Sequence, residues 1–284
     1  MIIRRGTGFE RAMKRFIVQN WGVILTVVLA AQIIVVASRY TDVLETDVFS
    51  ATAVGLLATV VGIFIVFRFN EAYQRWWEAR ILWGGLVNES RNFARQVLTF
   101  VTPRRASGVS SDAQASELQR TLVYRHLAYC NALRLSLRRQ DEWEELEPFL
   151  SREELDSLEG VVNKPTRLNF DQGRQLEPLF GTDTSETLLY KQLDETLNRL
   201  FDIQGGCERI KSTAFPDEVR FISKAMVWLS AVAIPFAFLS ADKDIHVLEI
   251  IAVIVICLSF MVVEQLGAKL KNPFENLDND TPMT

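Results

Sequence analysis

The longest apolar run in the chain has twenty uncharged residues, Val48 to Phe67, and continues without a proline into RFNEAYQRWWEARILWGGLVNESRNF. A helix rises ~1.5 Å per residue, so this run is long enough to cross the ~30 Å hydrocarbon core of a bilayer. After Phe67 the pattern becomes amphipathic, with charges of both signs between apolar positions. It predicts one helix that spans a membrane and continues into water to about Val101, where Thr102 and Pro103 end it.

Three other apolar runs predict three further spans: Trp21 to Ala37, Ala225 to Ala241 and Ile245 to Val263. No small-residue cleavage site follows the first run, so we expect a retained helix rather than a signal peptide. Most of the charge lies between the second and third runs. The chain is thus predicted to divide into an N-terminal helix with two spans (1–67), a cytosolic helical domain (68–220), two more spans (221–263) and a cytosolic tail (264–284).

The polar central segment also has helical periodicity. Ser151 and Glu154 form a capping-box pattern, which begins a short helix. We interpret 103–116 as a loop and the sequence NKP at 163–165 as the turn that ends the short helix. No segment shows the alternation of a strand, so the chain is predicted to be all-α. The helices predicted in this segment beyond Val101 are 117–139, about 151–159 and 185–207.

Lysines and arginines gather on one side of the predicted spans. The N-terminal segment and both flanks of the central segment carry several, whereas the loops on the other side, SRYTDVLETD and ADKDIH, have one basic residue each. By the positive-inside rule, both termini and the central segment face the cytoplasm.

The composition argues against several classes of function. The 284 residues carry a formal net charge of −4, so no basic surface favours nucleic acid. The three cysteines are widely spaced, and the two histidines, His126 and His246, lack metal-ligand spacing. No phosphate-binding glycine loop, GxSxG or HExxH motif occurs. We therefore predict no enzyme, cofactor or metal site, and interpret both histidines as ordinary packing or surface residues.

The apolar faces of the central segment predict self-association. This segment has too few long helices to bury its own Trp- and Phe-rich stripes, and a four-span protomer encloses no pore. A cyclic homo-oligomer is the simplest arrangement that covers such faces, so the expected partners are copies of the chain and membrane lipids.

A stripe on the second span is the main candidate site. Thr59, Ile63 and Phe67 lie at i, i+4 and i+8 and therefore share one helical face. Around a symmetry axis they would form a hydroxyl ring above two apolar rings, a constriction that closes by dewetting. The stripe could instead pack against another helix, since Gly55 and Gly62 allow close approach. Periodicity alone favours packing.

Three segments resemble the bestrophin family, specifically its bacterial members: FRFNEAYQRWWEARILWGGLVNESRNFARQ, QGGCERIKSTAFP and KNPFENLDNDTPM. They occur in the family's order, and the resemblance covers nearly the whole chain. It implies a homopentameric ion channel of the bacterial inner membrane, with second-span helices around a neck and a cytosolic vestibule closed by an aperture. The family favours chloride and other anions, whereas the acidic outer loop with Asp42, Glu45 and Asp47 favours cations such as sodium. The sequence leaves this selectivity open.

The resemblance also assigns residues. The RWW motif, Arg75, Trp76 and Trp77, sets the register that implies a neck at the Thr59 stripe. The same register, kept to Pro216 at the head of the third span, implies an aperture at Leu188. The NPF motif of the tail is Asn272, Pro273 and Phe274.

Two positions depart from the family pattern. Thr59 replaces an apolar residue in the outermost ring, which predicts a neck that hydrates more easily. Animal members bind calcium through an acidic cluster after NPF, and of the positions involved Asn272, Asp278 and Asp280 remain here. Leu277 stands where an acid is expected and Lys269 where a neutral ligand is expected. A lost carboxylate and an added positive charge weaken a calcium site, so we predict no calcium gating.

Two other functions remain as alternatives. A membrane-anchored interaction or sensor protein would conduct nothing, and the bulky cytosolic segment favours it. A secondary transporter would require broken helices or paired ionisable residues within the spans, where Glu249 stands alone.

Overall fold

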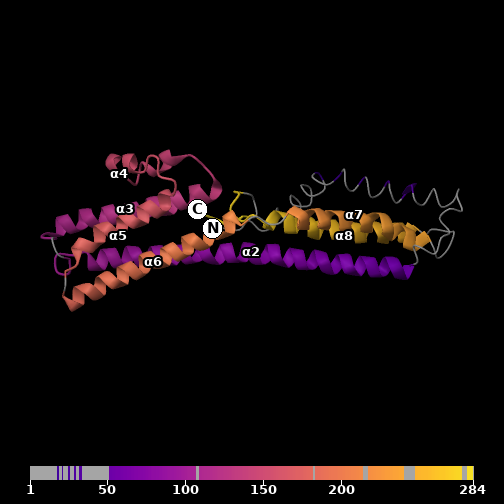
Figure 1. Cartoon of the computed structure of the whole chain (residues 1–284), viewed down its shortest axis with the longest axis horizontal. Helices are drawn as coiled ribbons and strands as arrows, with labels where there is room; N and C mark the ends of the chain where they lie inside the picture. Colours follow the sequence, from indigo (N-terminus) through magenta and orange to yellow (C-terminus); the bar gives the residue numbers. More distant parts are fainter. Residues whose placement is uncertain are drawn as a thin grey trace. The chain divides into compact units, whose positions relative to one another are not determined.

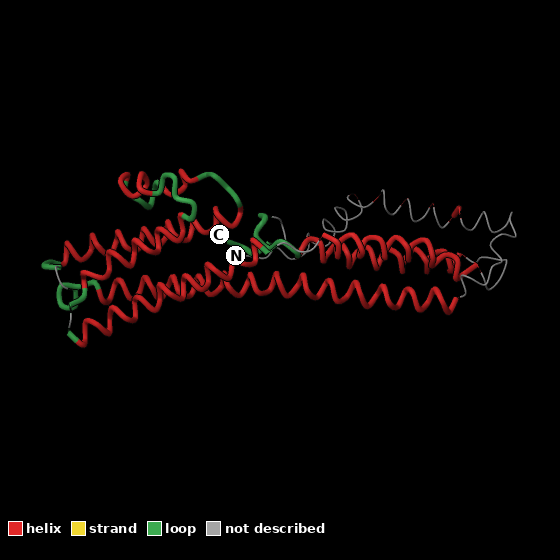
Figure 2. Tube along the Cα trace, viewed as in Figure 1, coloured by secondary structure: helices red, strands yellow, loops and turns green. Residues whose placement is uncertain are grey.

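The computed structural model describes residues 51–106, 109–181, 183–213, 217–239, 247–276 and 280–283, with six separate positions between 18 and 33. Within the described helices, nothing is said of the side chains at 51, 217, 220, 235–239 and 247–250, which include that of Glu249. Pro216, His246 and most of the predicted first span lie outside the described residues. Figure 2 shows helices and loops, and no strand, in the described part of the chain. The all-α prediction is confirmed.

The described helices follow one another in the order α2 (Ala51–Phe100), α3 (Asp112–Arg138), η3 (Trp143–Leu146), α4 (Arg152–Ser157), α5 (Lys164–Leu176), η4 (Glu177–Leu179), α6 (Thr184–Ser212), α7 (Asp217–Leu239) and α8 (Val247–Leu270). The apolar run and its charged continuation form one helix of 50 residues, α2, which ends at Phe100.

The chain divides into two compact units. The apolar unit comprises 1–73 and 215–269, and the polar unit comprises 74–214 and 270–284. Helix α2 contributes its first part to the apolar unit and its second part to the polar unit.

The apolar unit is built on three helices. The first part of α2 packs against α7 and α8 (Figure 1) through a core that includes Val61, Ile65, Val227 and Cys257. Among the described residues, two helices are long and apolar enough to cross a membrane: α2 from Thr52 onward and α8 over Ile251–Leu270. Helix α7 has a shorter apolar stretch, Phe221–Ile234. Many of their large apolar side chains remain exposed within the single chain.

The polar unit has its own core between the second part of α2 and α3, α5 and α6. Phe93, Tyr129, Leu133 and Leu200 lie in this core. The Tyr129 hydroxyl donates a hydrogen bond of 3.0 Å to the carbonyl oxygen of Leu200, so α3 is joined to α6 by a buried polar contact as well as by packing.

Two predictions in the central segment were partly wrong. The capping box at Ser151 is confirmed, and α4 ends at Ser157, but the NKP sequence begins another helix, α5. The Asn163 side chain accepts a hydrogen bond from the backbone N–H of Thr166. Pro165 lies in the first turn, where a backbone N–H would have no acceptor within the helix, so its missing N–H costs nothing. The predicted loop 103–116 is also too long, because Ser111 caps α3 and the helix starts at Asp112.

Glycines in the family-like motif QGGCERI allow α6 to lie close to α2. A Cβ at Gly206 would lie 2.9 Å from a methyl carbon of Leu82, whereas a Cβ at Gly205 would have no neighbour within 4 Å. Glycine therefore has a packing role at 206, whereas no described residue lies close enough to require it at 205.

We expect Gly206→Ala to be less stable than Gly205→Ala by about 1 kcal/mol, because both gain helix propensity but only the first must displace the methyl groups of Leu82. The measurement is the temperature at which the purified full-length chain in detergent loses its helical circular dichroism. Equal temperatures for the two variants would show that Leu82 moves freely.

Candidate functional site

The candidate stripe lies on the face of α2 that is turned away from α7 and α8. Ile63 is 53% exposed, Phe67 is 66% exposed and Thr59 is also exposed, whereas Val61 and Ile65 are almost completely buried. Two residues along a helix correspond to a rotation of about 200°, so Ile63 points almost opposite to Val61. The described helices of the protomer therefore leave this stripe uncovered.

The Thr59 hydroxyl is already hydrogen-bonded. Its Oγ1 donates to the carbonyl oxygen of Gly55 at 2.8 Å, one turn earlier in the same helix. The oxygen can still accept hydrogen bonds from water, since one hydroxyl has two acceptor lone pairs. Thr59 thus offers an acceptor on a face whose next two members, Ile63 and Phe67, are apolar.

The candidate aperture residue lies in the polar unit. Leu188 is in the second turn of α6 and is 55% exposed, while Leu193, further along α6, is fully buried in the core. The structure thus presents Leu188 on an uncovered face of its helix.

The RWW motif has a structural role at the end of α6. The Arg75 guanidinium donates hydrogen bonds to the carbonyl oxygens of Ile210 and Thr213, the latter at 2.7 Å. Carbonyls in the last turn of a helix lack intrahelical donors, and a positive charge there also complements the helix dipole. Trp76 and Trp77 follow with ring centroids 6.2 Å apart. Arg75 therefore fixes α6 to α2, a role that its sequence context alone does not reveal.

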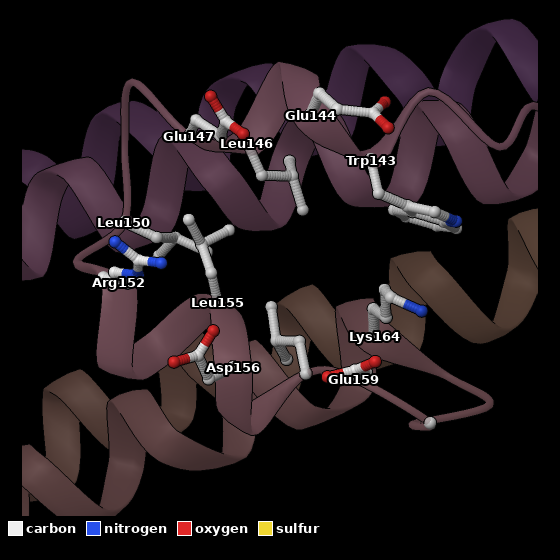
Figure 3. A pocket seen from close by; sticks show the side chains of 12 residues that line it. Trp143, Glu144, Leu146, Glu147, Leu150, Arg152, Leu155, Asp156, Glu159 and Lys164 are labelled. Atoms are coloured by element: carbon white, nitrogen blue, oxygen red, sulfur yellow. The ribbon is translucent and has the colours of Figure 1, made fainter.

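A surface pocket of about 880 Å³ lies between η3, α4 and the start of α5 (Figure 3). Leu146 and Leu155 lie between walls that carry carboxylates such as Glu144 and Asp156. At one end the Lys164 ammonium lies 4.6 Å from the centre of the Trp143 ring. The titratable groups of the lining are the carboxylates Glu144, Glu147, Asp156 and Glu159 and the cations Arg152 and Lys164.

Among the described residues, no group of three or more His, Cys, Asp or Glu side chains is arranged to hold a metal ion. His126 is 5% exposed, and its ring centre lies 4.9 Å from that of Phe93. Its Nε2 is 3.6 Å from the sulfur of Cys130. His126 is therefore a packing residue of the polar core.

Comparison with known proteins identifies the family. The model of the family described as "Bacterial/Fungal Bestrophin protein" matches residues 12–284. The chain belongs to the bestrophin family. It is 30% identical over 237 residues to a voltage-dependent anion channel-forming protein of Mesorhizobium japonicum, an alignment that covers 84% of this chain and 72% of that protein. It is 28% identical to the voltage-dependent anion channel-forming protein YneE of Escherichia coli, over 83% of this chain and 72% of that protein.

Solved bestrophins have the same fold. A crystal structure of a bacterial bestrophin homologue from Klebsiella pneumoniae, in a mutated form, matches with a TM-score of 0.79 at 25% identity. The match covers 92% of this chain and 91% of that chain. The family resemblance drawn from the three sequence segments is confirmed, and membership of this family points to a channel rather than an enzyme.

The tail of this bestrophin packs into the polar unit. Phe274 of the NPF motif is 1% exposed, and Pro273 and Met283 are also buried. The backbone N–H of Thr281 donates to the carbonyl oxygen of Pro273 at 3.3 Å. Leu277 and Asp278 lie outside the described residues, so the absence of calcium gating stays a prediction.

We expect the bestrophin fold here to lose stability between pH 6.5 and 4. Burial lowers the pKa of His126 from 6.5 to about 4, so in this range the unfolded chain binds a proton that the folded chain does not. The group accounts for about 3 kcal/mol that is present above pH 6.5 and is lost as the pH falls to 4. The measurement is the thermal midpoint of the detergent-solubilised chain at pH 7 and pH 4.5.

The control is His126→Phe, which has a similar shape and no titratable nitrogen. The drop between pH 7 and pH 4.5 should be smaller in this variant than in the wild-type chain. An equal drop in both proteins would place the acid sensitivity elsewhere.

Proposed function

We propose that this bestrophin is a channel subunit that conducts small anions across the bacterial inner membrane. The observation that carries the proposal is the uncovered stripe of Thr59, Ile63 and Phe67 on a helix that is long and apolar enough to span a bilayer. Family membership supports it, and so do relatives named as voltage-dependent anion channel-forming proteins.

In the proposed assembly, five copies surround one axis and the stripes of their α2 helices form the neck. Thr59 forms the outermost ring, and Ile63 and Phe67 form two apolar rings below it. Leu188, exposed on α6, forms the cytosolic aperture. The large exposed apolar side chains of α7 and α8 then face neighbouring subunits or lipid.

The proposed orientation follows the distribution of basic residues. The neck crosses the inner membrane, the polar unit and both termini lie in the cytoplasm, and the four spans of the family layout hold each subunit in the bilayer. The subunit's partners are then its own copies, membrane lipids and the permeating ions.

Selectivity for anions is the part of the proposal that rests most on the relatives. An apolar ring has no intrinsic preference for the sign of an ion, so charges at the mouths decide between chloride and sodium. The acidic residues of the predicted outer loop oppose anions, whereas the similarity to relatives named as anion channel-forming proteins favours them.

Purified full-length protein reconstituted in a planar bilayer between unequal NaCl solutions tests the proposal. Discrete currents that reverse near the chloride equilibrium potential are the expected result. Reversal near the sodium potential would reject anion selectivity and keep the channel. An intact oligomer without current would reject conduction and favour the membrane-anchored interaction protein.

A further inference from the structure

Next to the candidate stripe of Thr59, Ile63 and Phe67, a buried ion pair joins α2 to α8. Arg68 Nη1 lies 3.0 Å from Glu264 Oε1, and the two side chains are only 8% and 10% exposed. Arg68 follows Phe67 in the chain but points about 100° away from it around the helix, into the packed face. A buried charge that loses its partner is costly, so the pair specifies which turn of α8 lies against which turn of α2.

Two contacts of van der Waals distance, one on each side of the pair, belong to the same interface. A Cβ at Gly62 would lie 3.6 Å from the ring of Phe260, and a Cβ at Gly267 would lie 3.6 Å from the Cα of Phe69. The α8 positions Phe260, Glu264 and Gly267 have spacings of four and three residues and share one face. Helices α2 and α8 therefore run in the same direction and stay in contact along the part of α2 that carries the stripe.

The apolar core around these contacts, which includes Val61, Ile65 and Cys257, holds the helices together by packing that has no preferred direction. The hydrogen-bonded pair is directional, because a guanidinium and a carboxylate bind well only in a narrow range of geometry. Rotation of α2 would break the pair and would turn Phe67 away from its present direction.

We propose that the Arg68–Glu264 pair is a positioning device for the neck, which holds Phe67 toward the pore axis. This inference rests on the proposed channel function and adds to it the element that sets the innermost ring. Phe67 contacts the permeating ion, and the pair acts only through Phe67.

The test is Glu264→Gln in the wild-type and in the Phe67→Leu background, recorded as single channels in planar bilayers. With Phe67 present, we expect the ratio of open to closed time to change by about threefold or more. With Leu at position 67 the same substitution should change the ratio much less. Arg68→Lys, which keeps a positive charge, should have a smaller effect than Glu264→Gln.

The matched control is Asp171→Asn, which breaks the 2.7 Å pair of Arg167 and Asp171 on α5 and should leave the ratio unchanged. An unchanged ratio in Glu264→Gln, or an equal change in both backgrounds, would overturn the inference, because a merely structural pair does not depend on residue 67. If Glu264→Gln does not assemble, Arg68→Lys in the same two backgrounds decides by the same criterion. Absence of current from the wild-type chain would overturn the proposed function itself.

Discussion

Replacement of Thr59 by Ile should lower the open probability of the channel about tenfold, equivalent to ~1.4 kcal/mol against the hydrated neck. The wild-type stripe has two apolar members, and its third member carries an oxygen that can accept hydrogen bonds from water. Isoleucine removes that oxygen in every subunit and extends the apolar constriction from two rings to three. Single-channel recording at one voltage and salt concentration gives the open probability directly.

Two smaller substitutions separate polarity from size. Thr59→Val has nearly the shape of threonine without the hydroxyl and should also lower the open probability, whereas Thr59→Ser keeps the hydroxyl and should not. If Ile and Val both left conductance and open probability unchanged, the hydroxyl would have no part in hydrating the neck. If only Ile lowered them, bulk rather than polarity would be the cause.

Much of the fold could be predicted because its signals are local. The apolar run and its amphipathic continuation lie within the single helix α2, and the Ser151 capping box needs only four residues. Their spacing alone placed Thr59, Ile63 and Phe67 on one helical face, and all three side chains are exposed in the structure. Spacing could not distinguish a pore face from a packing face. The resemblance to the bestrophin family favoured the pore.

Helix α5 was missed because its buried face is partly polar. Asn169 donates to the carbonyl oxygen of Leu197 and Gln172 donates to that of Leu122, at 3.2 and 2.6 Å. Both carbonyls belong to other helices, α6 and α3. An amide side chain that is buried by such long-range contacts looks like a surface residue in the sequence, so the hydrophobic pattern underestimates this helix.

The pairing of Arg68 with Glu264 was also beyond the sequence. The two residues are 196 positions apart, and each stands at the edge of an apolar run, where a charge normally faces water. Only the packing of α8 on α2 shows that both are buried. Likewise, Arg75 belongs to a recognisable motif, but its hydrogen bonds to the end of α6 follow from the tertiary structure.

The polar unit depends on one buried arginine in a similar way. Arg125 on α3 is 8% exposed, and its Nε donates to Glu154 Oε1 at 2.7 Å. Its Nη1 donates to the side-chain oxygens of Gln172, at 3.2 Å, and Gln175. A single guanidinium thus joins α3 to α4 and α5. Burial raises the pKa of the Glu154 carboxyl, but hydrogen bonds from Ser151 and Arg125 outweigh this effect and lower it.

Arg125→Met should destabilise the chain by about 3 kcal/mol, because it leaves a carboxylate and two amide oxygens without their shared donor. The thermal midpoint of the full-length protein in detergent measures the loss. Arg120→Met is the matched control, since Arg120 lies on the same helix with its guanidinium over the exposed Tyr124 ring, and should change the midpoint little. Arg125→Lys should lie between them, because an ammonium keeps the charge but not the planar fork of donors. Equal midpoints for Arg125→Met and Arg120→Met would mean that the three acceptors find water or other donors once Arg125 is gone. The apolar contacts of α4 and α5 would then be sufficient to hold these helices in place.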